Sequence, residues 1–87
     1  MRFVENARVY NTDNGLLLKR NVTREELGDG WTKWTTRSIY FRQKAEDYWM
    51  HVEKIVVDRD ASLVDRQDYC YVVEEDYVRT FNKNTET

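Results

Sequence analysis

The clearest periodic pattern in the sequence is a run of apolar residues at helical spacing in its middle third. The apolar positions are Ala45, Tyr48, Trp49, Val52, Ile55 and Val56. Charged residues fill most of the intervening positions. This spacing predicts an amphipathic helix over about residues 43–55, with one face packed on a sheet. A strand is disfavoured here, because alternation would place Trp49, His51 and Glu53 together on one face.

Other segments have the composition of strands. Threonine and aromatic residues crowd the region after Gly30 and favour a strand over Arg37–Arg42, and Tyr69–Val73 is a further strand by composition. Asn14-Gly15 is a typical two-residue hairpin turn. It predicts an N-terminal hairpin in which a strand within Phe3–Thr12 pairs with a strand within Leu16–Val22.

Two segments carry signals for the start of a helix. Thr23–Glu26 fits a capping box, and Gly28 would end that helix after one or two turns, before a turn at Asp29-Gly30. Glu74–Asp76 places three acids where a helix N-terminus favours negative charge. This predicts a short C-terminal helix whose inner face is formed by Tyr77, Val78 and Phe81.

Together these elements predict an α+β domain. It would have a small single-layer antiparallel or mixed sheet of about four to five strands, the main amphipathic helix packed on that sheet, and the short C-terminal helix. A chain of 87 residues suits a single domain, expected over residues 1–82 and followed by a polar tail at 83–87. The core of so small a domain is thin, so the 12 aromatic residues would close much of it.

Composition bears on the compartment. The longest apolar runs, Leu16–Leu18 and Ile55–Val57, are far too short to span a bilayer. The first fifteen residues lack the apolar stretch of a signal peptide, and a single cysteine, Cys70, cannot form an internal disulfide. We therefore expect a cytoplasmic protein without membrane contact, in the host cytoplasm if a phage encodes it.

The sequence offers no convincing catalytic set. His51 falls on the polar side of the predicted helix, and Cys70 lies between two tyrosines in a strand predicted to be buried, where a thiol is usually inert. One histidine and one cysteine cannot form a structural zinc site. The acidic segment 58–68 lacks the glycine and terminal glutamate of an EF-hand. We expect no enzymatic activity, no cofactor and no bound metal.

Charge is distributed unevenly along the chain. Residues 1–44 hold nine Lys/Arg and five Asp/Glu, whereas residues 45–87 hold five and eleven. Carboxylates in the second half could oppose a basic groove on a protein partner. The candidate residues are Asp58, Asp60, Asp65, Asp68, Glu74, Glu75 and Asp76.

The leading functional hypothesis is therefore a small non-catalytic regulator or inhibitor that binds a protein. Such a protein could be of the type that phages encode against nucleic-acid-handling host proteins, acting through an acidic face that imitates phosphates. The high tyrosine and tryptophan content supports an interface, because these residues are enriched at binding hot spots. An open sheet edge would also allow a homodimer.

The alternative is a module that binds single-stranded nucleic acid. The segment Trp31–Arg42 interleaves aromatic and basic residues, which can stack on bases and pair with phosphates. The candidate residues are Trp31, Lys33, Trp34, Arg37 and Arg42. Against this reading, the sequence pI of about 5.4 is far from the basic value typical of such domains.

Overall fold

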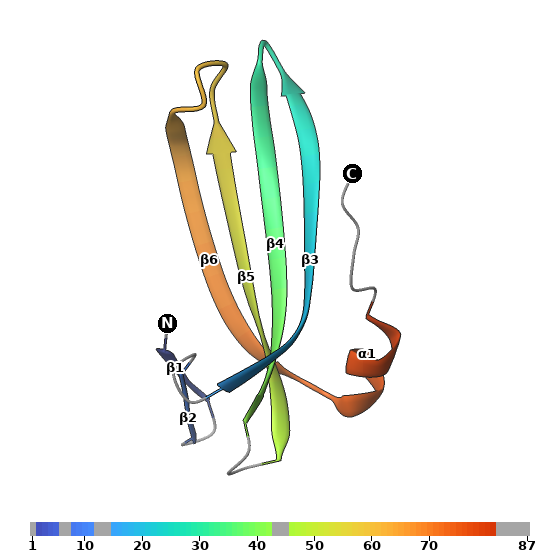
Figure 1. Cartoon of the computed structure of the whole chain (residues 1–87). Coiled ribbons are helices and arrows are strands. Elements are labelled where there is room, and N and C mark those ends of the chain that lie inside the picture. The colour runs from blue at the N-terminus through green and yellow to red at the C-terminus, as the bar shows by residue number, and fades with distance from the viewer. Residues whose placement is uncertain (1, 6–7, 12–14, 43–45, 82–87) are drawn as a thin grey trace.

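The structure is a computed structural model that describes residues 2–5, 8–11, 15–42 and 46–81 (Figure 1). Four long strands form one antiparallel sheet in chain order. They are β3 (Gly15–Gly28), β4 (Trp31–Arg42), β5 (Asp47–Val57) and β6 (Leu63–Val73). Two short strands, β1 (Arg2–Glu5) and β2 (Arg8–Asn11), pair with each other in a separate sheet. One short helix, α1 (Glu75–Thr80), follows β6.

The turn between β3 and β4 lies at Asp29-Gly30, as predicted. The φ angles of Gly28, Asp29 and Gly30 are 101°, 56° and 84°. Glycine adopts positive φ without strain and aspartate tolerates it, which suits a tight hairpin turn. Gly30 is also needed for space, because a Cβ atom there would lie 2.7 Å from the Cβ of Arg59. The tip of this hairpin therefore lies against the turn between β5 and β6.

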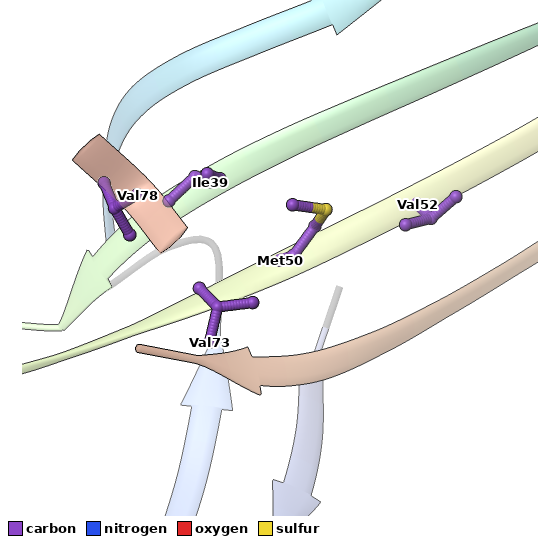
Figure 2. Close-up of a cluster of buried hydrophobic side chains, with 5 residues drawn as sticks. All are labelled: Ile39, Met50, Val52, Val73 and Val78. Atoms are coloured by element: carbon purple, nitrogen blue, oxygen red, sulfur yellow. The ribbon is translucent and has the colours of Figure 1, made fainter. Parts of the chain in front are cut away.

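The hydrophobic core lies on the face of the sheet that α1 covers, here called the helix face. Ile39, Met50 and Val52 are at most 2% exposed, and Val73 and Val78 complete the cluster (Figure 2). Neighbouring strands bring these side chains together because directly opposed residues share a face, as Met50 does with Ile39. Val78 reaches this layer from α1 and closes it from above.

A second buried layer lies on the opposite face of the sheet. Trp49 has no exposed surface and stacks on Tyr40 of the neighbouring strand, with ring centroids 4.6 Å apart. Because its neighbour Met50 is also fully buried on the helix face, the start of β5 is buried on both sides. This double burial explains why β5 does not show the simple alternation of a half-buried strand.

The prediction of a main amphipathic helix over residues 43–55 is wrong. Residues 43–45 lie outside the described residues, and β5 occupies 47–57. The reason given against a strand also fails, since Trp49, His51 and Glu53 do share one face. That arrangement is stable because β6 supplies charged partners: His51 lies 3.4 Å from Asp68, and Glu53 accepts hydrogen bonds from Arg66.

Three smaller predictions also need correction. Thr23–Glu26 does not begin a helix but belongs to β3, where Arg24 and Glu26 form an ion pair of 2.7 Å two residues apart on one face. The expected N-terminal hairpin does not form, because β1 pairs with β2 and β3 pairs with β4. The acidic segment 58–68, expected to be a connection throughout, is a connection only over 58–62, because β6 begins at Leu63.

The other expectations agree with the structure in part. An antiparallel sheet and a short helix after β6 are present, and the two strands predicted around Arg37–Arg42 and Tyr69–Val73 belong to the longer β4 and β6. Asn14 and the polar tail at 83–87 lie outside the described residues.

Candidate functional site

The most distinctive exposed feature is a group of three tyrosines on the helix face, which we call the tyrosine surface: Tyr69, Tyr71 and Tyr77. Alternate residues of a strand share a face, so β6 places Tyr69 beside Tyr71, with ring centroids 6.1 Å apart and nearly parallel. Tyr77 comes from α1. The three side chains are 46%, 37% and 42% exposed. Large aromatic side chains of a small domain are here left in contact with solvent rather than in the core.

The tyrosine surface borders a hollow of about 300 Å³ at the junction of β6 and α1. Its lining consists of Tyr71, Val73, Glu74 and Tyr77. This hollow exists because the chain turns at Glu74 and lays α1 back over the sheet, where Val78 is buried. A pocket lined by two tyrosines, a valine and one acidic residue can accept an apolar or a basic side chain.

Tyr71 is held in place by the core beneath it. Its hydroxyl donates a hydrogen bond to the Sδ of Met50 at 3.4 Å. Burial raises the pKa of the Tyr71 hydroxyl, the neighbouring Tyr77 and Tyr69 raise it further, and Arg37 lowers it. The hydroxyl is therefore protonated at physiological pH and can donate this hydrogen bond, which fixes the orientation of the ring as an apolar wall.

α1 is positioned by one basic side chain as well as by Val78. Lys19 of β3 donates a hydrogen bond from its Nζ to the carbonyl oxygen of Val78 at 2.6 Å, and that nitrogen also lies 3.5 Å from the carbonyl oxygen of Phe81. Both acceptors belong to the C-terminal end of the helix, where a positive charge is favourable. A helix of six residues does not form alone in water, so these contacts determine where Tyr77 lies.

The seven acidic candidates do not gather on one face. Asp58 and Asp60 lie in the turn between β5 and β6, Asp65 and Asp68 point to opposite faces of β6, and the remaining three lie at the start of α1. Asp58 has a structural role, since its carboxylate accepts hydrogen bonds from the backbone amides of Asp60 and Ser62. The structure brings together only Glu74, Glu75 and Asp76, next to the hollow.

The five nucleic-acid candidates are also divided. By alternation along β4, Trp31, Lys33 and Arg37 point to the helix face, whereas Trp34 and Arg42 point to the opposite face. Trp34 lies under the guanidinium of Arg24, which is 5.9 Å from its ring centroid.

The opposite face carries a polar cluster, of which His51 and Cys70 were candidates from the sequence whereas Arg20 and Ser38 were not. His51 and Cys70 are directly opposed on β5 and β6, and His51 Nε2 lies 3.4 Å from Asp68 Oδ2. Next to them, Arg20 donates a hydrogen bond to the buried Ser38 at 3.0 Å. Arg20, Ser38 and His51 border a hollow of about 470 Å³. The helix prediction hid this cluster because it placed His51 on a solvated helix surface.

The thiol of this cluster is poorly suited to nucleophilic attack. Burial raises the pKa of Cys70 to about 11, and the carboxylate of Asp68 contributes to the rise. A thiol with this pKa is almost fully protonated near neutral pH, and it is the thiolate that attacks electrophiles and binds metals. Within the described ranges, no three His, Cys, Asp or Glu residues are grouped as a metal site would require.

Comparisons with known proteins give no further guidance to the site. No protein-family model, no curated protein and no solved structure matches the chain. Among the residues that the structure describes, no helix is long and apolar enough to cross a membrane.

Proposed function

We propose that the chain is a small non-catalytic protein-binding module of regulatory or inhibitory type, and that it contacts its partner through the tyrosine surface. The observation that supports this most is the placement of three exposed tyrosines on one face, two of which, Tyr71 and Tyr77, line an apolar hollow. Tyrosine is enriched at interface hot spots because its ring supplies a large contact area and its hydroxyl a polar handle.

The chemistry of the hollow suggests what the partner presents. The hollow is lined by the two tyrosines Tyr71 and Tyr77 together with the acidic residue Glu74. Lysine or arginine fits these features, because its stem packs on aromatic rings while its charge meets the carboxylate. Glu75 and Asp76 extend the negative charge along α1. In this proposal they are the acidic part of the contact, and phosphate imitation by all seven acids stays a prediction.

The proposal is tested by selecting binders from a displayed library of random peptides and measuring their affinity for variants. We expect selected peptides to be rich in basic residues and to bind Tyr71→Ser and Tyr77→Ser about 30-fold more weakly, the loss of one hot spot. Leu27→Ser is the matched control, because Leu27 is 46% exposed on β3, the strand at the other edge of the sheet. Equal affinity for all three variants would contradict the proposal.

A second candidate function, binding of single-stranded nucleic acid, is favoured by one observation. Arg37 and Lys54 share the helix face with Tyr69, and the Nζ of Lys54 lies 5.8 Å from the ring centroid of Tyr69. Cations beside exposed rings can pair with phosphates while bases stack. Titration with single-stranded RNA and DNA tests this, since genuine binding weakens steeply as salt rises. Lys54→Ala should weaken it, whereas Tyr77→Ser should affect only the protein-binding function.

A further inference from the structure

We propose that the outer edge of β6 is a self-association surface, on which β6 of a second copy of the chain adds in antiparallel orientation to form a continuous eight-stranded sheet. The two-fold axis passes through Gln67 of both copies. This inference is independent of the tyrosine surface, because it concerns backbone groups in the plane of the sheet rather than side chains above it.

The two outer strands of the sheet differ in how well their edges are protected. Free edges are usually protected by lysine, proline or irregularities that interrupt pairing. β3 has Lys19 and other basic residues along it, and its pairing with β4 is irregular near both ends. β6 contains no lysine, and its pairing with β5 is interrupted only at Val64.

The edge of β6 is also accessible. Every residue from 61 to 69 is exposed. Within the described ranges no strand pairs with this edge; β1 approaches β6 but forms its ladder with β2. A long accessible strand with unpaired amides and carbonyls is a template for the addition of another strand.

The sequence of β6 is complementary to itself about Gln67. In an antiparallel pair related by a two-fold axis, directly opposed residues share a face and their numbers sum to twice that of the central residue. Centring on Gln67 therefore opposes Arg66 to Asp68 of the second copy, and Asp68 to its Arg66. Asp65 then opposes Tyr69. Opposite charges directly across a ladder stabilise the pairing, and here the symmetry makes two such pairs.

The neighbouring symmetric registers lack this complementarity. If the axis passes through Arg66, the two Arg66 side chains of the dimer lie directly opposite each other. An axis through Asp68 or Asp65 likewise places two identical carboxylates opposite each other. Like charges directly opposite destabilise a ladder. An axis at Tyr69 opposes Arg66 to Val72, so a charge meets an apolar residue. The charge pattern therefore selects the register centred on Gln67.

Apolar residues flank the charged centre of this register. Leu63 and Val64 are 60% and 45% exposed. In this register they lie opposite the part of the second copy's β6 that begins at Cys70. The bulge at Val64 ends the regular ladder there, so five residues, 65–69, form the paired centre. Pairing would remove the exposed apolar ends of β6 from water while leaving the tyrosine rings directed out of the sheet plane.

The register is tested by disulfide formation in a Cys70→Ser background, where an introduced cysteine is the single thiol. Directly opposed residues have Cα atoms about 4.5–5.5 Å apart, within the range that a disulfide spans. Gln67→Cys should therefore cross-link with itself on mild oxidation. Asp65→Cys and Tyr69→Cys should each fail to cross-link alone, because in this register the same residue of the two copies lies four residues apart along the ladder, about 13 Å. An equal mixture of these two variants should cross-link.

Sedimentation of the unmodified chain supplies the second measurement. The expected mass is about double the 10.6 kDa of one chain. A single-chain mass at the concentrations used for NMR would overturn the proposal. A dimer in which Asp65→Cys or Tyr69→Cys cross-links alone, or in which Gln67→Cys does not, would overturn the register. The side chains at 65, 67 and 69 are exposed and Cys70→Ser replaces the half-buried thiol with a hydroxyl of similar size, so circular dichroism should show an unchanged fold in each variant.

Discussion

Replacing Lys19 with methionine should loosen α1 from the sheet. Methionine keeps the length and apolar stem of lysine but cannot donate the hydrogen bond of 2.6 Å to the carbonyl oxygen of Val78. A hydrogen bond to a charged group contributes about 1.5–3 kcal/mol, and a positive charge at a helix C-terminus adds about 0.3–1 kcal/mol. Because the site is only partly buried, we take the low end of this range and expect a loss of about 2 kcal/mol.

This loss is measured by urea denaturation, with Lys33→Met as the matched control. Lys33 lies on the same face as Lys19 but close to the β3–β4 turn, and Figure 1 shows this turn far from α1. A domain of this size loses about 4–8 °C of Tm per kcal/mol, so a decrease of about 8–16 °C should accompany the Lys19 variant. The NMR signals of Tyr77 should also shift. A change within about 0.5 kcal/mol, as for ordinary surface substitutions, would refute the assigned role of Lys19.

Three further predictions concern the hairpin tip, the core and the thiol. Gly30→Ala should cost about 2 kcal/mol in urea denaturation, because positive φ penalises a Cβ atom and the facing turn leaves no room for it. Met50→Ala should cost about 3 kcal/mol by the same assay, whereas Leu27→Ala, at an exposed site on β3, should stay within about 0.5 kcal/mol of wild type. Alkylation of Cys70 at pH 8 should be about 100-fold slower than for a thiol of pKa 9.0, and Asp68→Asn should accelerate it. Because the folded pKa is raised, the stability contributed by the protonated thiol is present below pH 9.0 and is lost as pH rises through about 11.

The sequence indicated those elements that depend on local chemistry. Asp29-Gly30 forms the predicted turn because its backbone needs residues that accept positive φ. α1 begins at the predicted acidic residues, and Val78 is on its inner face as expected. Tyr77 was expected inside with it, but it is exposed because a helix of six residues can direct only a narrow stripe toward the sheet.

The sequence could not settle the structure of residues 47–57 by periodicity. The start of β5 is buried on both faces, so apolar residues are consecutive at Tyr48–Met50, and together with the later apolar residues they also fit a helical spacing. Met50 and Trp49 are adjacent and both fully buried, which neither simple pattern predicts. The many β-branched and aromatic residues of 47–57 favour a strand, and this composition is the sequence signal that agrees with the structure of β5.

The candidate site depended on that assignment. Only when β5 is a strand does β6 lie beside it, with Tyr69 and Tyr71 on the helix face and Asp68 opposite His51. The strand predicted by composition at Tyr69–Val73 puts Tyr69 and Tyr71 on one face, but the approach of Tyr77 depends on how α1 folds back over the sheet. Contacts of this kind lie between distant residues and carry no local signal.

The strand assignment of β5 underlies every surface described above, and NMR tests it most directly. The antiparallel register predicts nuclear Overhauser effects between Met50 and both Ile39 and Tyr71, together with strong sequential contacts from each Hα to the next amide proton through 47–57. Medium-range contacts between residues three apart throughout 47–57, without those cross-strand contacts, would contradict the account.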